Sequence, residues 1–282
     1  MLSMWRLLSV SLAAAVTLSA ATQKDIVRFV KKGLNSNESI QVLNVKVLEK
    51  QPLQKPKGWD AFVVEFKLKV NKGGREQIVK DRDILFASDR YVAPDLIDVK
   101  TNRSLKSQII LSVDQSFYNK EHLLYGNPNA KHKIVIFSDP LCPFCREVMP
   151  ELMRIAKRYP NTFALYYYHL PLKSLHPASV PLAKAIIFLK NNGRKDLIEK
   201  IYKTPFDYEE KDEAKVLQDL NRKLGLRLTL SDINRPEVLQ ELQADMNKAR
   251  DLMIHGTPTV FVDGKYDKYR TKYKAYIPKS DR

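Results

Sequence analysis

The chain has 282 residues, of which 44% are hydrophobic and 28% are charged, as in an ordinary globular protein with one or two domains. A formal net charge of +16 would normally indicate a nucleic-acid partner. We exclude that partner because the sequence lacks a basic-aromatic recognition motif and begins with a segment typical of export. We interpret the excess of lysine as a solvated surface, with attraction to acidic protein chains or to an anionic membrane as the alternative.

Residues 1–21 have the organisation of a secretory signal peptide. One cation, Arg6, precedes the apolar run Leu7–Leu18, and the small residues Ser19-Ala20-Ala21 supply a cleavage site. The apolar run is too short and wrongly flanked for a membrane span, and an uncleaved signal anchor is the alternative. We therefore predict an exported protein that works in an oxidising compartment.

Residues 22–100 predict a small α+β domain. The segment Asp25–Leu34 places its apolar residues on one face of an amphipathic helix. Alternating apolar residues then predict an antiparallel meander, with an irregularity near Leu43-Asn44 and a hairpin turn at residues 71–74. The predicted strands are Ile40–Leu48, Asp60–Val70, Arg75–Lys80 and Ile84–Ala87. Because this domain contains no cysteine and no histidine, we predict a structural or partner-binding role for it.

Residues 101–121 predict a linker, which Ser116–Leu124 continues as a short helix. Residues 122–282 predict a second domain. The second domain begins with a buried strand, a helix and a second strand, and this order of elements predicts a parallel crossover. We interpret the aromatic run of the second strand, Tyr166–Tyr168, as half-buried. The two strands are Lys133–Phe137 and Phe163–Leu170.

A mostly helical insertion is predicted at about residues 173–253, before a last strand at Pro258–Val262. We interpret the charges of its last helix as a solvated face, and Ser231 as the N-cap of a short turn. The predicted helices are Ala178–Leu189, Asp196–Tyr202, Asp212–Leu224 and Pro236–Ile254.

The two cysteines of the chain, Cys142 and Cys145, lie where the first strand of the second domain turns into a helix. A helix N-terminus offers unpaired N–H groups and the positive end of the dipole, and both favour a thiolate. The spacing i, i+3 brings the two thiols onto one face, close enough to form a disulfide. We predict that Cys142 is the exposed nucleophile and that Cys145, one turn further in, is the resolving thiol of a redox-active disulfide.

Two other interpretations of this cysteine pair are weaker. A purely structural disulfide would close a very short loop and therefore would constrain the unfolded chain little. A zinc site would need about two further ligands, and the histidines show no metal-ligand spacing. We therefore predict no metal and no cofactor. The histidines are His122, His132, His169, His176 and His255.

The sequence Phe137–Cys145 (FSDPLCPFC), the helix residue Pro150 and the late pair Thr257-Pro258 together resemble the thioredoxin superfamily. The helical insertion is similar to its DsbA-like branch. The segment Leu85–Leu105 in an exported two-domain chain resembles the DsbC/DsbG family of periplasmic thiol–disulfide isomerases. This resemblance implies that Pro258 follows a cis peptide bond next to the cysteines. It also implies that Thr257 and Pro258 bind the backbone of a client, the protein whose disulfides are exchanged.

The resemblance also implies a cystatin-like N-terminal dimerisation domain and an α/β thioredoxin-like catalytic domain with a helical insertion. The N-terminal domains would pair in a homodimer, either by simple pairing or by exchange of the first helix. The pair Pro143-Phe144 between the cysteines differs from the best-known members, which leaves the redox potential open. The lysine-rich tail after Gly264 predicts that the closing helix of the fold is reduced or absent.

These observations together predict a periplasmic thiol–disulfide oxidoreductase that isomerises or reduces incorrect disulfides in misfolded client proteins. Cys142 would attack the client disulfide, and Cys145 or a second client thiol would release the mixed disulfide. A membrane thiol reductase would keep the pair reduced. A DsbA-like oxidase that donates its disulfide is one alternative, and a chaperone whose thiols are secondary is another.

Overall fold

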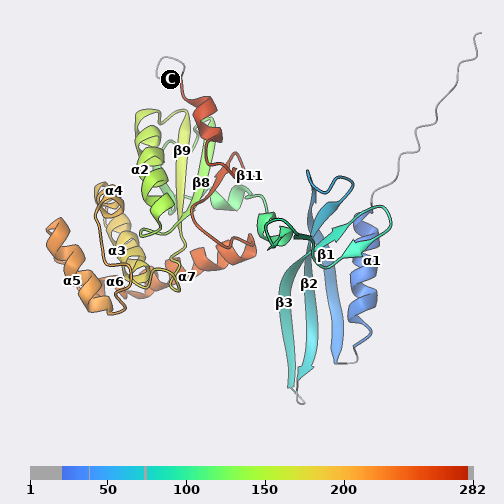
Figure 1. Cartoon of the computed structure of the whole chain (residues 1–282). Coiled ribbons are helices and arrows are strands. Elements are labelled where there is room, and N and C mark those ends of the chain that lie inside the picture. The colour runs from blue at the N-terminus through green and yellow to red at the C-terminus, as the bar shows by residue number, and fades with distance from the viewer. Residues whose placement is uncertain (1–20, 38, 73–74, 279–282) are drawn as a thin grey trace, which may run out of the picture. The chain divides into compact units, whose positions relative to one another are not determined.

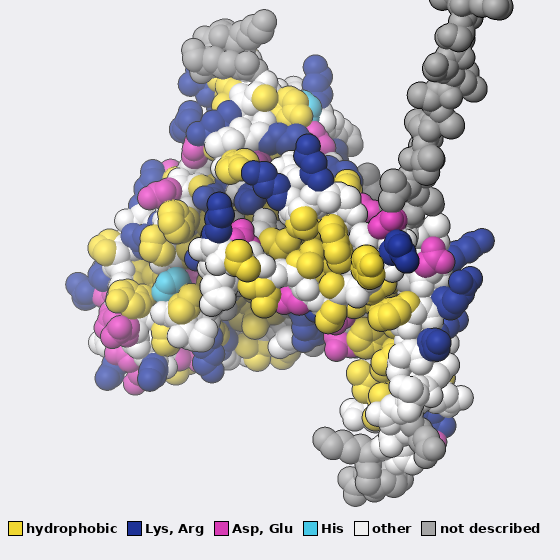
Figure 2. Space-filling view, turned by 45° about the vertical axis from the view of Figure 1, so that its right-hand side comes forward, with side chains coloured by type: hydrophobic (Ala, Val, Ile, Leu, Met, Phe, Trp, Pro, Cys, Tyr) yellow, Lys and Arg dark blue, Asp and Glu magenta, His cyan; other side chains and the backbone are white. Residues whose placement is uncertain are grey.

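The computed structural model describes residues 21–37, 39–72 and 75–278, so all but the last residue of the predicted signal peptide lies outside it. The chain forms two compact units that divide between Ile109 and Ile110 (Figure 1). Among the described residues, no helix combines the length and the apolar character that a bilayer span requires. Figure 2 shows lysine and arginine side chains scattered among acidic, polar and apolar ones, which fits a solvated surface.

The first unit is a helix followed by an antiparallel sheet, as predicted. The helix, α1, is capped by Thr22, whose side chain accepts a hydrogen bond from the backbone N–H of Asp25 while the Asp25 carboxylate accepts one from the backbone N–H of Thr22. The sheet has the order β1-β2-β3-β4, and the pairing of its first two strands shifts register between Val42 and Asn44, where the irregularity was predicted. The elements are α1 (Gln23–Leu34), β1 (Ile40–Pro52), β2 (Asp60–Lys72), β3 (Arg75–Ala87) and β4 (Val92–Ala93).

The two strands predicted between residues 75 and 87 are one continuous strand, so this part of the prediction is wrong. Polar residues interrupt the apolar pattern there, but the backbone of β3 pairs with β2 without a break from Arg75 to Ala87. Residues 97–108 form the short hairpin β5 (Ile97–Asp98) and β6 (Arg103–Ser104), followed by a turn of 3-10 helix. Ile26 of α1 packs against the sheet in a small core that includes Val45, Val47, Phe62 and Val64.

The second unit is built on a five-stranded sheet with the order β11-β10-β8-β9-β7. Strands β8 and β9 are parallel and are joined through α2, as predicted, whereas β10 runs antiparallel to β8. Figure 1 shows α2 running alongside β8 and β9. The elements are β7 (Leu123–Gly126), β8 (His132–Ser138), α2 (Pro143–Arg158), β9 (Phe163–His169), β10 (Thr259–Val262) and β11 (Lys265–Tyr266).

Strand β7 was not predicted, since residues 116–124 were interpreted as a helix. The 3-10 helix there is limited to Gln115–Phe117, and Leu123–Gly126 pairs with β9 instead. The insertion has the predicted helices, but Thr229 rather than Ser231 caps the short helix α6. In the described part of the tail, the only helix is a 3-10 turn at Lys272–Tyr276. The helices of the insertion are α3 (Ser179–Asn191), α4 (Asp196–Lys203), α5 (Glu213–Leu224), α6 (Leu230–Ile233) and α7 (Pro236–Asp251).

The aromatic run of β9 is fully buried, which corrects the half-buried interpretation. Tyr166, Tyr167 and Tyr168 are each at most 1% exposed. Strand β9 lies between β8 and β7, and both of its faces are covered. On one face of the sheet, Tyr167 packs edge-on against Tyr202 of α4. On the other face, Tyr168 stacks on its neighbour Phe137 of β8.

The last long helix, α7, does not carry only solvated charges, which corrects a second interpretation. Asp245 is 0% exposed, and its carboxylate accepts hydrogen bonds from His122 Nε2 at 2.7 Å and from His169 Nδ1 at 2.8 Å. Burial opposes ionisation of Asp245, but the bonds from His122 and His169 outweigh it and lower the pKa of this carboxyl to about 2. The bond from His169 attaches α7 to β9, and the bond from His122 attaches it to the segment just before β7.

Candidate active site

The two cysteines lie at the start of α2, as the sequence predicts. Cys142 is the N-cap residue with extended backbone angles, and Pro143 occupies the first helical position, where a missing N–H costs no hydrogen bond. Cys145 lies one turn further in and is 0% exposed. No disulfide joins the two cysteines in this structure.

Pairing of the strands brings the Thr257-Pro258 peptide to the cysteines. Strand β10 begins at Thr259, which lies opposite Phe137 near the end of β8, so the residues just before β10 flank the loop that leads to Cys142. The Thr257-Pro258 bond is cis. Cys142 Sγ donates a hydrogen bond to the carbonyl oxygen of Thr257 at 3.3 Å. The fold thus joins residues that are 115 positions apart in the sequence.

Cys142 is less accessible than predicted, because only 5% of it is exposed. Its side chain turns toward Thr257 instead of pointing into solvent. Cys142 is still the more accessible of the two thiols, since Cys145 is fully covered. The prediction of an exposed nucleophile is therefore wrong. His255, which follows α7, is exposed.

Several donors converge on the sulfur of Cys142. The side chain of Cys145 has the largest effect and lowers the pKa of the Cys142 thiol. Burial has the opposite effect, because it opposes ionisation. The side chain of Thr257 and the backbone N–H groups of Cys145 and Phe144 also favour the thiolate. Together they lower the pKa of Cys142 to about 5. Thr257 Oγ1 is buried and has no hydrogen-bond partner within the described chain, so its O–H is available to this thiolate.

Cys145 has the opposite electrostatic character. Burial raises the pKa of Cys145, and the neighbouring Cys142 thiolate raises it further, while Ser138 and the backbone of Asp139 favour its ionised form. The backbone N–H of Asp139 donates to Cys145 Sγ at 3.5 Å. Behind Ser138, the hydroxyl of Tyr202 donates to Ser138 Oγ at 2.7 Å. The pair therefore consists of one readily ionised thiol and one thiol held protonated.

The low pKa of Cys142 predicts how its alkylation depends on pH. Because the folded-state pKa is lowered to about 5, the thiolate is present above pH 5 and is lost as the pH falls through that value. We expect the rate of reaction with iodoacetamide to reach half its plateau near pH 5. In Thr257→Val, which lacks the donor hydroxyl, we expect the midpoint to move to higher pH. A midpoint near 8.5, the ordinary thiol value, would contradict the proposed set of donors.

Asp139 organises this site, and the sequence analysis assigned it no role. Its carboxylate is 0% exposed. One oxygen accepts from the backbone N–H groups of Leu141 and Cys142 and from the hydroxyl of Ser179, at 2.7, 3.3 and 2.5 Å. The other oxygen accepts from the backbone N–H of Leu172 at 2.8 Å and faces His176 Nδ1 at 3.1 Å. One side chain thus joins the cysteine loop to the segment after β9 and to α3.

A signal for Asp139 was present in the sequence. An aspartate that directly follows a buried strand and precedes a proline can accept hydrogen bonds from the backbone N–H groups of the following turn. The bonds to Leu141 and Cys142 have this local origin. The bonds to Leu172 and Ser179 join residues 33 and 40 positions apart, and no local pattern indicates them.

Within the described residues, one group of side chains has metal-ligand spacing, and it lies away from the cysteines. It consists of His122, Glu241 and Asp245. His122 and Asp245 already bond to each other, and Glu241 pairs with the ammonium group of Lys190. Because a cation beside Glu241 opposes the binding of a metal ion, we assign this cluster to the attachment of α7.

Comparison with known proteins relates the second unit to a large family. A family model described as thioredoxin matches residues 118–276. Among curated proteins, the chain is 24% identical over 147 residues to the Na(+)/H(+) antiporter NhaA 1 of Mycobacterium sp. strain KMS. A similar match, 23% identical over 141 residues, is to NhaA 1 of Mycolicibacterium gilvum. These matches cover 51% and 50% of this chain but only 24% and 23% of the antiporters, so the chain spans about a quarter of their length.

Solved structures of similar proteins cover about half of the chain. A thioredoxin-like oxidoreductase from Silicibacter pomeroyi DSS-3 is 26% identical and covers 52% of this chain and 87% of its own, with a TM-score of 0.44. The catalytic domain of Proteus mirabilis ScsC is 23% identical and covers 54% and 83%, with a TM-score of 0.42. BdbD from Bacillus subtilis is 18% identical and covers 58% and 92%, with a TM-score of 0.47. Since the family model matches more than half of its length, the chain belongs to the thioredoxin family.

Proposed function

We propose that the protein is an exported, periplasmic thiol–disulfide oxidoreductase that isomerises or reduces incorrect disulfides in client proteins. The observation that carries this proposal is the unequal pair of thiols beside the Thr257-Pro258 peptide. Cys142 has a pKa lowered to about 5, while burial raises the pKa of Cys145. This difference gives one thiol the role of nucleophile and the other the role of resolving thiol.

In the proposed reaction, the thiolate of Cys142 attacks one sulfur of a client disulfide. A Cys142–client disulfide forms, the client disulfide breaks, and the second client sulfur leaves as a thiolate that takes up a proton. A different client thiol can then displace Cys142, which isomerises the client without a net change in oxidation state. Alternatively, Cys145 loses its proton and displaces the client, which reduces the client and leaves a Cys142–Cys145 disulfide. A membrane thiol reductase would return that disulfide to two thiols.

Thr257 and Pro258 are proposed to bind the client during these steps. A segment before a strand at the edge of a site can present its backbone to an extended peptide. The carbonyl oxygen of Thr257 lies 3.3 Å from Cys142 Sγ and is therefore beside the reacting sulfur. A client segment that lies along Thr257 and Pro258 would bring its own sulfur to Cys142. No cofactor takes part in this chemistry.

The first unit is proposed to form a homodimer, as in the DsbC/DsbG family. Strand β1 is an edge of its sheet, with 13 residues that could pair with a second chain. A hollow beside α1 is lined mainly by apolar side chains, including Phe29, which is 53% exposed. Both features are surfaces that a second copy could cover.

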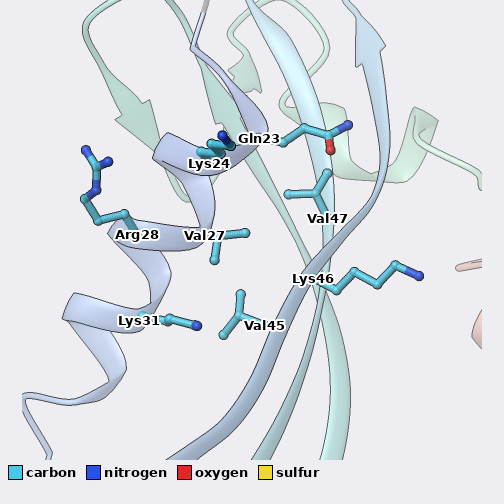
Figure 3. A pocket seen from close by; sticks show the side chains of 8 residues that line it. All are labelled: Gln23, Lys24, Val27, Arg28, Lys31, Val45, Lys46 and Val47. Carbon is cyan, nitrogen blue, oxygen red and sulfur yellow. The ribbon is translucent and has the colours of Figure 1, made fainter.

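A second hollow of this unit is unsuited to self-pairing. It has a volume of about 580 Å³ and lies between α1 and β1 (Figure 3). Val27, Val45 and Val47 line it together with the cations Lys24, Arg28, Lys31 and Lys46. A two-fold contact at this hollow would bring like charges of the two copies together, which opposes association.

An oxidase function is the second candidate, and one observation favours it. A low pKa of the nucleophilic thiol stabilises the reduced form and therefore makes the disulfide form more oxidising. The pKa of Cys142, about 5, has this effect. An oxidase would donate a Cys142–Cys145 disulfide to a reduced client, and the dimer would then need another role.

The test is recovery of activity from a scrambled, fully oxidised multi-disulfide substrate in a glutathione buffer. For an isomerase, we expect the mature protein to restore activity and Cys142→Ala to fail. Rapid oxidation of a reduced substrate without recovery of the scrambled one would support the oxidase. A third outcome would indicate a chaperone. In that case, the unmodified protein neither isomerises nor oxidises these substrates, and the Cys142→Ala variant still protects a cysteine-free client from aggregation.

A further inference from the structure

In the turn that follows β11, the side chain of Arg270 lies over the ring of Phe144. The guanidinium carbon of Arg270 lies 5.7 Å from the centre of the Phe144 ring, and Phe144 stands between the two cysteines. The Phe144 side chain is 58% exposed although it belongs to the motif, and Tyr269, next to Arg270, is 75% exposed. An exposed aromatic ring and a cation thus lie together at a residue between the two cysteines.

The position of Arg270 is determined by the fold of this turn. Its backbone has a φ of 56°, a left-handed conformation that a non-glycine residue adopts only when its surroundings favour it. The backbone N–H of Arg270 donates to Asp267 Oδ1 at 3.0 Å, and that of Lys272 donates to Asp267 Oδ2 at 2.7 Å. The backbone N–H of Asp267 in turn donates to the carbonyl of Val260 in β10, at 2.8 Å. The turn is therefore fastened to the strand that follows Pro258.

The charge of Arg270 is not neutralised within the part of the chain that the structure describes. Asp267 bonds to the backbone of Arg270, and no described carboxylate forms an ion pair with its guanidinium group. A guanidinium group has a planar set of donors that matches a carboxylate, so an acidic partner could occupy it. An incoming peptide is the partner that this place beside Cys142 would receive.

We propose that Phe144 and Arg270 form a recognition site for client segments that carry an acidic residue next to the reactive cysteine. This inference rests on the proposed function, because it assumes that Cys142 reacts with peptides. A client whose sulfur reaches Cys142 passes the Phe144 ring, and Arg270 pairs with a carboxylate on the neighbouring residue. The same cation repels a client with lysine in that place.

The test uses peptides that differ only in the two residues after their single cysteine, which are Glu, Gln or Lys. Each cysteine is linked to 2-thiopyridine, an electrically neutral leaving group. Attack by Cys142 forms the Cys142–peptide disulfide and breaks the pyridyl disulfide, and the released pyridine-2-thiolate takes up a proton to form the coloured thione. The protein is the mature full chain with Cys145→Ala, so that the mixed disulfide persists and one release is measured.

We expect the release rate to fall in the order Glu, Gln, Lys, with about a threefold or larger difference between the Glu and Lys peptides at low salt. Arg270→Glu should reverse the order, and Arg270→Lys should keep it. Arg158→Glu is the matched control, since Arg158 also lies over an aromatic ring, that of Tyr159, but at the opposite end of α2. Both glutamate variants change the net charge equally, and only Arg270→Glu should alter the order.

The outcomes separate this inference from the proposed function. If no peptide releases thione, or if Cys142→Ala releases it equally fast, the proposed function itself is wrong. If release depends on Cys142 but the order is the same with Arg270→Glu as with Arg158→Glu, the recognition site is wrong and the exchange activity stands. Circular dichroism of each variant establishes that it is folded before the rates are compared.

Discussion

Replacing Cys142 by serine is expected to reduce thiol–disulfide exchange to the uncatalysed rate, whereas replacing Cys145 by alanine is expected to trap a covalent complex. Cys142 has a pKa lowered to about 5 and is the thiolate at neutral pH, while burial raises the pKa of Cys145. Without Cys145, a mixed disulfide formed at Cys142 can be released only by another thiol. Non-reducing electrophoresis and mass spectrometry of the protein with a disulfide-containing client measure both results.

The two variants also report on the reaction type. Isomerisation should survive Cys145→Ala better than net reduction does, because only reduction requires the second cysteine of the protein. Cys142→Ser with Cys145 intact serves as the control for capture, since the remaining thiol is 0% exposed. A covalent complex through Cys145 in that variant, or none through Cys142 in the other, would contradict the assignment of nucleophile and resolving thiol.

Replacing Asp139 by alanine is expected to lower the free energy of unfolding by about 3–5 kcal/mol. The Asp139 carboxylate is 0% exposed and accepts from the backbone N–H groups of Leu141, Cys142 and Leu172. Removal of the carboxylate takes the acceptor away from the N–H groups of Leu141 and Leu172 and from the buried hydroxyl of Ser179, while the N–H of Cys142 keeps its bond to the backbone carbonyl of residue 139. Each buried donor left without a partner costs about 1–3 kcal/mol. Urea unfolding of the reduced protein, with the free energy taken from the midpoint and slope, measures the change.

Asp212→Ala provides the matched control for this measurement. Asp212 also accepts two backbone hydrogen bonds, from Ala214 and Lys215, but it does so at an exposed helix N-terminus. Loss of such a cap is expected to cost about 1 kcal/mol, because water can reach the freed N–H groups. Equal losses for Asp139→Ala and Asp212→Ala would show that burial of Asp139 adds nothing. Asp139→Asn, which keeps one acceptor oxygen, should fall between them.

Local sequence patterns predicted much of this protein correctly. The strand before Cys142 and the helix after it were predicted, as was the irregularity between Val42 and Asn44, because alternation and helical spacing are local properties. The resemblance of Thr257-Pro258 to a superfamily loop also predicted its cis bond and its place beside Cys142. The assignment to the isomerase branch, and the homodimer that comes with it, stay predictions.

Other features depended on partners that are distant in the sequence. Strand β7 was missed because Leu123–Gly126 is short and becomes a strand by pairing with β9. The aromatic run of β9 has the composition of a strand, but its composition does not show that helices cover both faces of the sheet. The charge of Asp245 suggested a solvated position, while its actual partner His122 lies 123 residues away.

The sequence by itself therefore identified the groups of the candidate site: two thiols three residues apart, at the start of a helix, in a chain predicted to be exported. Only the tertiary structure decided how accessible and how acidic those thiols are. Cys142 Sγ lies 3.3 Å from the carbonyl oxygen of Thr257 and is largely covered, and the buried carboxylate of Asp139 accepts a hydrogen bond from the backbone N–H of Cys142. Accessibility and pKa depend on every atom within a few ångströms, and folding brings those atoms together from separate parts of the chain.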